Sequence, residues 1–306
     1  AEHKMELGQQ TSAVVDFEIT PEHRGYEEYT VKVLPWPGES TLANNQCRVG
    51  VAALEEKIRV LMVEGMPAWD SKFIAQLLQK QKDIHLVSLY RLSSDKYLSI
   101  ETDENKPGEN SENVFPEDAA AFRKYDLIIF GRGAEYFLTT ERINLLKQFV
   151  RDHGGGVLFA RGKPYANSFP ELESLEPITW GQEVEGDFSL RPTPAGEEAG
   201  LFSDVLPGPK DPVWDKLPPL SHARESARSK AFSQVLANGV TANSRAFPVV
   251  ISQRYGKGLV ITVNLDGLWQ WDFFPAHEGT SNIYRNFWCR LAQWVVSGWA
   301  APDDPS

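Results

Sequence analysis

The stretch that decides the fold is IRVLMVEGMPAWDSKFIAQLLQKQKDIHLVSLYRL, residues 58–92. An apolar run at 58–65 is followed by a helical pattern from Asp70 to Lys82 and by a second apolar run at 85–92. A strand, a helix and a strand in this order form a unit whose two strands run parallel. The stretch therefore predicts an α/β protein with a mainly parallel sheet flanked by helices.

The same alternation returns further along the chain. It predicts strands in YDLIIFGRG (125–133), GGGVLFA (154–160) and PVVISQRYGKGLVITVN (248–264), and helices at 140–153 and 281–297. Thr140 is the expected N-cap of the first of these helices. Two segments lack this periodicity. The acidic, Asn-rich residues 93–118 are predicted to be a mobile surface loop, and the Pro- and Trp-rich residues 165–247 are predicted to be irregular.

The first part of the chain has a different pattern. Residues 12–52 alternate apolar and polar side chains between turn residues, as half-buried strands do. The expected organisation is a small β module at 1–56, an α/β domain at 57–300 and a tail at 301–306. Since the chain begins Ala1-Glu2, we expect it to be a piece of a larger protein.

Charge and composition exclude several classes of function. A net charge of −11 argues against nucleic acid as a partner. No apolar run of about 18 residues is present, so no membrane span is predicted. The six histidines lack metal-ligand spacing and the two cysteines, Cys47 and Cys289, form no zinc motif, so we expect no metal and no cofactor. The sequence leaves the compartment and the oligomeric state open.

Loops that follow the predicted strands carry the candidate binding residues. In open α/β sheets, ligands bind beyond the carboxyl ends of the strands, so these loops are expected to share one rim. An alternative is that the charged side chains brace the loops with ion pairs and bind nothing. The candidate rim consists of Trp69, Asp70, Arg132, Arg161, Lys163, Asn264, Asp266, Trp269 and Trp271.

Two further observations concern these loops. Trp269 and Trp271 alternate with polar residues and are suited to line a groove for a sugar or a peptide, although burial of at least one in the core is expected. The chain has no G-x-S-x-G or G-x-C-x-G motif, and Cys289 within a helical stripe is expected to be core packing. The sequence therefore indicates no nucleophile of the usual kinds.

Four segments together resemble a known family. IRVLMVEGMPAWDSKFIAQLL, YDLIIFGRGAEYF, GGGVLFA and YGKGLVITVNLDGLWQWDF, in that order, are similar to the class I glutamine amidotransferase-like domain of large bacterial envelope proteins. The resemblance covers about residues 57–298 and implies a flavodoxin-like fold. VVDFEIT and GYEEYTVKV before it resemble strands of a partial immunoglobulin-like adhesion module.

The reactive residues of that family are absent. The resemblance places its nucleophile elbow at residues 160–163, with Arg161 or Gly162 where the family has Cys, and its His-x-Glu pair at 264–266, which reads Asn-Leu-Asp. Arg cannot act as a nucleophile, and Asn264 cannot accept and return a proton.

The resemblance thus implies a non-catalytic module that binds a small ligand or a protein partner within a membrane-anchored, envelope-associated protein. Two alternatives remain from the residues. One is a hydrolase or transferase with Ser168 or Asp70 as nucleophile, and the other is a structural spacer.

Overall fold

The computed structural model describes residues 25–35, 39, 45–53, 57–102, 108–110, 115–202, 212–274 and 282–297. The chain divides into two compact units, Ala1–Glu56 and Lys57–Ser306. The first strand expected in the N-terminal module, at 12–21, and the expected tail at 301–306 lie outside the described residues.

The described part of the first unit is a two-stranded hairpin. Strand β1 (Gly25–Lys32) pairs antiparallel with β2 (Gln46–Ala53), with Tyr29 opposite Val49. An immunoglobulin-like module packs two sheets against each other. The described residues of this unit supply one pair of strands and no second sheet.

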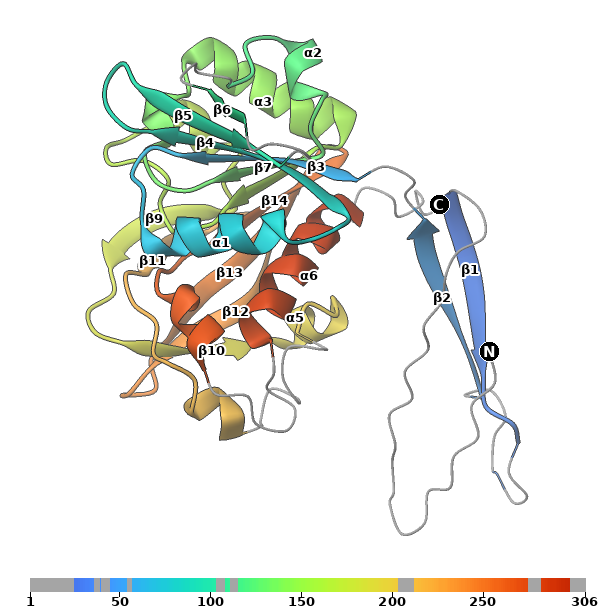
Figure 1. Cartoon of the computed structure of the whole chain (residues 1–306). Helices are drawn as coiled ribbons and strands as arrows, with labels where there is room; N and C mark the ends of the chain where they lie inside the picture. The colour runs from blue at the N-terminus through green and yellow to red at the C-terminus, as the bar shows by residue number, and fades with distance from the viewer. Residues whose placement is uncertain are drawn as a thin grey trace. The chain divides into compact units, whose positions relative to one another are not determined.

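The second unit is built on a ten-stranded sheet (Figure 1). Five neighbouring strands, from β14 to β4 in the order below, run parallel through four pairings. Five further pairings, three before β14 and two after β4, are antiparallel. In spatial order the strands are β10 (Phe188–Pro192), β12 (Ser233–Thr241), β13 (Ala246–Tyr255), β14 (Gly258–Val263), β8 (Gly156–Phe159), β7 (Leu127–Phe130), β3 (Ile58–Glu64), β4 (Ile84–Arg91), β5 (Tyr97–Glu101) and β6 (Gly108–Asn110).

The expectation of a mainly parallel, flavodoxin-like sheet is therefore wrong, because antiparallel strands extend the parallel centre on both sides. The apolar runs did mark the centre of the sheet, where strands are covered on both faces. Along β3, Val60 and Met62 join the core on one face, and Leu61 and Val63 join the core on the other. The alternation of apolar and polar residues in the outer strands predicts a strand less clearly than the apolar runs of the central strands do.

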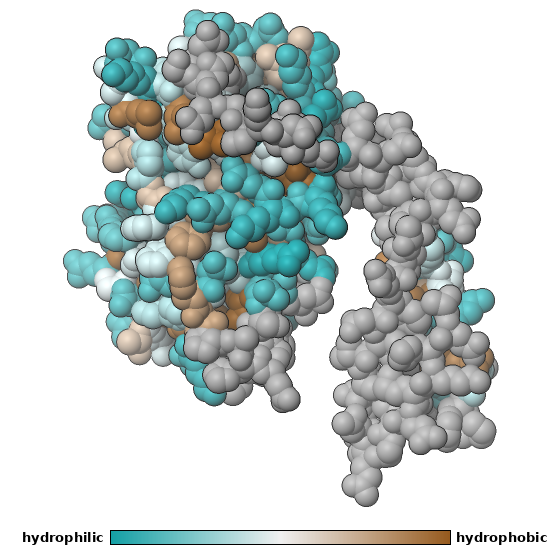
Figure 2. Space-filling view, viewed as in Figure 1, coloured by the Kyte–Doolittle hydropathy of each residue, from teal (hydrophilic) through white to brown (hydrophobic). Residues whose placement is uncertain are grey.

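Helices cover the two faces of the parallel centre (Figure 1). On one face α1 (Trp69–Gln79) and α6 (Ile283–Ser297) pack Ile74 and Phe287 into the same apolar cluster. The other face is covered by α2 (Ala119–Phe122) and α3 (Thr140–His153). The N-cap of α3 is Thr139, one residue before the expected Thr140, and its Oγ1 accepts from the Arg142 amide at 3.3 Å. Figure 2 shows that the face over α1 and α6 is mostly hydrophilic at its surface.

Both segments expected to lack regular structure contain it. Within 93–118, β5 and β6 extend the sheet and Phe115 is buried, while residues 103–107 and 111–114 lie outside the described part. Residues 165–247 were expected to be irregular, but they contain β10, β12 and a separate antiparallel pair, β9 (Ile178–Glu183) with β11 (Arg224–Ser229). The remaining short elements are α4 (Pro170–Glu173), α5 (Pro194–Glu198) and the 3-10 helices η1 (Ala134–Tyr136), η2 (Pro212–Asp215) and η3 (Leu268–Phe273).

Candidate functional site

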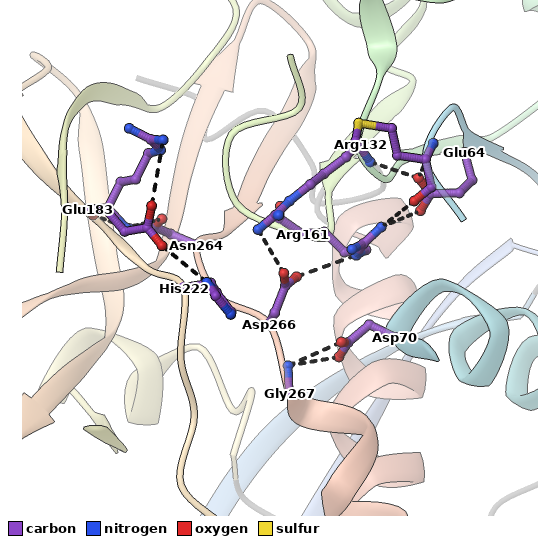
Figure 3. A network of polar contacts seen from close by, with 11 residues as sticks. Glu64, Asp70, Arg132, Arg161, Glu183, His222, Asn264, Asp266 and Gly267 are labelled. Atoms are coloured by element: carbon purple, nitrogen blue, oxygen red, sulfur yellow. Dashed lines mark hydrogen bonds and ion pairs between the residues drawn. The ribbon is translucent and has the colours of Figure 1, made fainter. Parts of the chain in front are cut away.

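Four charged side chains meet where neighbouring parallel strands end. Glu64 is the last residue of β3, Arg132 follows β7, Arg161 follows β8 and Asp266 follows β14. These four strands are adjacent and parallel, so their carboxyl ends lie at one edge of the sheet. Figure 3 shows the four side chains turned toward one another.

Arg161 is the centre of this network. Its Nη1 lies 3.0 Å from Glu64 Oε2 and donates to the Met66 carbonyl at 3.0 Å. Its Nε lies 3.4 Å from Asp266 Oδ1, and Asp266 Oδ2 lies 2.7 Å from Arg132 Nη2. Only 6% of the Arg161 side chain is exposed. A guanidinium so enclosed between two carboxylates braces three strand ends.

Glu64 is held on every side of its carboxylate. Oε1 accepts from the backbone amides of Met66 at 2.9 Å and Arg132 at 3.1 Å. Burial is the largest influence and raises the pKa of Glu64, while Arg161 acts in the opposite direction. Gly131 makes room for this carboxylate, since a Cβ there would lie 2.0 Å from Glu64 Oε2.

Asp70 closes the network on the side of α1. Its two carboxylate oxygens accept from the Gly267 amide at 3.2 and 3.1 Å, and Oδ1 also accepts from Trp269 at 3.3 Å. Burial raises the pKa of Asp70. Asp70 therefore fixes the turn after Asp266, and its oxygens are occupied by backbone donors.

Asn264 has a structural role beside this network. Its side chain accepts from the Arg224 amide at 3.0 Å and donates to the Arg224 carbonyl at 2.5 Å. Two residues on, the backbone of Asp266 pairs with that of Ser221. The segment 221–224 is thus fixed along the end of β14.

This segment brings a histidine to a cleft of about 200 Å³. His222 Nδ1 lies 3.1 Å from Glu183 Oε1 (Figure 3). Both side chains are exposed. Glu183 on β9 pairs with Arg224 on β11, two residues after His222, which brings the backbones of Glu183 and His222 close together. The cleft is lined by Met66, Arg132, Gly133, Lys163, Tyr165, Ala166, Glu183, His222 and Arg224.

The cleft is rich in cations. Lys163 and Arg224 line it together with Arg132, and Arg224 Nη2 lies 3.9 Å from Glu183 Oε2. Burial, and after it the charge of Arg224, lowers the pKa of Lys163. The combined field of these side chains favours a ligand that carries, or develops, negative charge.

Three of the expected rim residues lie elsewhere. Trp271 is buried and donates from Nε1 to the Pro218 carbonyl at 3.1 Å, so it lines no groove. Trp69 and Trp269 belong to a surface cluster of aromatic rings, 6.1 Å apart between centroids, with Phe73 and Phe273. Among the expected residues, the structure brings Asp70, Arg132, Arg161 and Asp266 into one network, and places Arg132 and Lys163 at the cleft.

Two functional candidates were missed by sequence reasoning. Glu183 and His222 come from the segment expected to be irregular, and 39 positions separate them. Their pairing depends on the β9–β11 ladder, whose register shifts twice. No fixed spacing marks such a pair in a sequence. Among the described residues, no group of three or more His, Cys, Asp or Glu side chains is arranged to hold a metal ion.

No model of a known protein family and no curated protein matches the sequence. Similar solved structures include a β-galactosidase from Rahnella sp. R3, with a TM-score of 0.44 and 14% identity over 78% of this chain and 31% of that chain. An exo-β-1,4-mannosidase from Opitutaceae bacterium strain TAV5 has a TM-score of 0.43 and 13% identity over 78% and 36% of the two chains. This chain therefore spans about a third of the length of those proteins.

The family resemblance is corrected by the first of these results, because no family model matches the sequence. The similar structures named above are glycosidases. The inference of a non-catalytic amidotransferase-like binding module is therefore also wrong, because that inference depended on the absence of the family's Cys and His-x-Glu. Association with the cell envelope stays a prediction. No described helix is long and apolar enough to cross a bilayer.

Proposed function

We propose that the chain is a hydrolase in which His222 activates a water molecule at the cationic cleft. The observation that carries this proposal is the 3.1 Å contact between His222 Nδ1 and Glu183 Oε1 in a cleft also lined by Lys163. A carboxylate on Nδ1 fixes the tautomer and orientation of an imidazole, and it leaves Nε2 for proton transfer. The pair is the base and orienting group of a hydrolytic site.

The chemistry uses water as the nucleophile. His222 Nε2 takes a proton as the water oxygen bonds to the carbonyl carbon of an ester. Lys163 and Arg224 stabilise the negative charge that develops on the carbonyl oxygen. The carbon–oxygen bond to the alcohol then breaks, and the proton returns from His222 to the departing oxygen.

The earlier candidates for a nucleophile do not fit this site. Asp70 is buried and accepts from backbone amides, and Ser168 lies at a neighbouring cleft that no described histidine lines. Water therefore takes the place of a protein nucleophile.

The lining favours a small anionic ester as the substrate. Three cations, Lys163, Arg224 and Arg132, accompany the dyad at the cleft, and Arg132 is paired with Asp266. Glycosidase chemistry normally uses two carboxyl groups on either side of the scissile bond. Among the described lining residues, Glu183 is the one carboxylate, so an ester with a negative charge fits better than a glycoside.

A structural spacer is the second candidate function. The enclosed Arg161, with Glu64 and Asp266 as partners, closes the rim with its own ion pairs. A spacer requires rigidity of this kind and no turnover.

The test measures release of nitrophenolate from p-nitrophenyl hemisuccinate, p-nitrophenyl phosphate, p-nitrophenyl acetate and a set of p-nitrophenyl glycosides. We expect turnover of p-nitrophenyl hemisuccinate, the anionic carboxylic ester, and a loss of roughly 10²- to 10⁴-fold in His222→Asn. p-Nitrophenyl phosphate has no carbonyl carbon and is the comparison for an anionic ester that the proposed step does not hydrolyse. His85→Asn is the matched control, because His85 Nε2 also contacts a carboxylate, Glu101, at 3.3 Å but lies on β4. Absence of turnover, or turnover that survives His222→Asn, supports the spacer.

A further inference from the structure

A second cleft of about 250 Å³ adjoins the first. Lys163 and Tyr165 line both clefts, so these two side chains lie where the clefts meet. The second cleft combines the rings of Tyr165 and Trp180 with the hydrogen-bonding groups of Ser168 and Thr179. Its walls come from the segment after β8, from β9, from Glu173 at the end of α4 and from Lys230 after β11.

A buried carboxylate fixes the two rings. Glu176 is fully buried, and it accepts from the Tyr165 hydroxyl at 2.8 Å and from Trp180 Nε1 at 2.9 Å. Lys230 Nζ donates to the backbone carbonyls of Glu173 and Glu176, which holds the end of α4 in place. Burying a carboxylate is costly. Tyr165 and Trp180, which donate to this carboxylate, both line the cleft. The buried carboxylate therefore fixes the orientation of two aromatic rings.

We infer that the second cleft binds a monosaccharide ring between Trp180 and the polar groups of Lys163, Ser168 and Thr179. A pyranose has an apolar face of C–H groups and a rim of hydroxyls, and it needs an aromatic surface and hydrogen-bonding groups together. The cleft supplies both. A purely aromatic ligand would form no hydrogen bonds with the ammonium, hydroxyl and carboxylate groups that surround these rings.

Rigid walls lower the entropic cost of binding a small ring that makes few contacts. Trp180 and Tyr165 are each tied by a hydrogen bond to one buried acceptor, so little side-chain freedom is lost when a ligand binds. Lys163 Nζ lies 4.8 Å from the centroid of the Tyr165 ring, at the junction of the two clefts. Binding at the second cleft goes beyond hydrolysis at the first and does not require it.

The experiment is saturation-transfer NMR on the full chain with methyl β-D-glucopyranoside, methyl β-D-galactopyranoside and methyl N-acetyl-β-D-glucosaminide. Phenol and cyclohexanol are the ring controls. We expect saturation of the C–H protons of at least one glycoside, and roughly tenfold weaker binding in Trp180→Ala, which corresponds to about 1.4 kcal/mol. Ser168→Phe keeps both walls and fills the cleft at its exposed rim, so it should also weaken binding.

Trp69→Ala is the matched control, because Trp69 is an exposed tryptophan (58%) in the separate aromatic cluster. It should leave glycoside binding unchanged. The inference is overturned if no glycoside is saturated, if Trp180→Ala and Ser168→Phe bind as the unaltered chain does, or if phenol binds more tightly than every glycoside. Because binding is measured without turnover, its failure is distinguishable from failure of the proposed hydrolysis.

Discussion

Arg161 and Glu64 form an ion pair of 3.0 Å whose side chains are 6% and 0% exposed, at the ends of two strands 97 positions apart in sequence. Removing one partner of such a pair leaves the other charge buried without compensation. The pair therefore ties the edge of the sheet together only as long as both partners are present.

The first prediction concerns this pair. We expect Arg161→Met to lower the free energy of unfolding by about 3–5 kcal/mol, since Glu64 and Asp266 both lose their buried counter-charge. Urea denaturation followed by circular dichroism measures the change. Adding Glu64→Gln should recover part of the loss, because it removes the uncompensated charge.

The control for this prediction is a surface pair. Arg151 Nε lies 2.8 Å from Asp152 Oδ1, and about half of each side chain is exposed. Arg151→Met should change the urea midpoint little, because exposed ion pairs contribute little to stability. An Arg161→Met variant as stable as Arg151→Met would contradict the role of Arg161 as a brace.

Part of this edge was predictable from the sequence and part was not. Arg132, Arg161 and Asp266 follow apolar runs, and parallel strands bring their carboxyl ends together, so a shared rim follows from the pattern. Whether such charges bind a ligand or one another depends on burial. The carboxylate that decides it, Glu64, has a run of apolar residues before it and gives no polar pattern of its own.

The outer strands were missed for a different reason. β12 reads SQVLANGVT, with a glycine inside and register shifts around Ala237, so its alternation of apolar and polar residues is interrupted. Glu183 and His222 lie in the same poorly patterned part of the chain. Their contact is a product of tertiary pairing, which local sequence does not encode.

The second prediction tests whether Glu183 acts through His222. We expect Glu183→Gln to lower kcat for the anionic ester and to have no added effect in the His222→Asn background, because an orienting group is useful only while its base is present. Steady-state kinetics of the two single variants and the double variant measure this coupling. Glu185→Gln, an exposed neighbour two positions on, is the matched control. Additive losses would show that Glu183 acts on the substrate independently.

The third prediction concerns the two thiols. Burial raises the pKa of Cys289 on α6, whereas Cys47 is exposed. Because the thiolate is the reactive form, iodoacetamide at pH 8 should modify Cys47 first and Cys289 slowly. Mass spectrometry of timed samples follows both sites. Cys289→Ser should leave ester hydrolysis unchanged, and a loss of activity in that variant would place a nucleophile at a partly buried position of α6, where the sequence predicts core packing.

The fourth prediction is a pH dependence of stability that arises from Glu176. Burial raises the pKa of Glu176 to about 7, from an ordinary value of 4.5, against the hydrogen bonds from Trp180 and Tyr165. The folded chain therefore holds a proton between these two values that the unfolded chain has released. This contribution to stability is complete below pH 4.5 and is lost as the pH rises through 7.

A shift of this size amounts to about 3 kcal/mol, at roughly 1.4 kcal/mol for each pKa unit. Urea denaturation at intervals from pH 4.5 to 8.5 measures it, and Glu176→Gln, which cannot ionise, provides the reference. The free energy of unfolding of the unaltered chain should fall relative to that of Glu176→Gln across this range, since the other titrating groups are common to both. Parallel curves for the two proteins would mean that Glu176 ionises at its ordinary pKa. The carboxylate between Tyr165 and Trp180 would then be accessible to water, contrary to the burial seen in the structure.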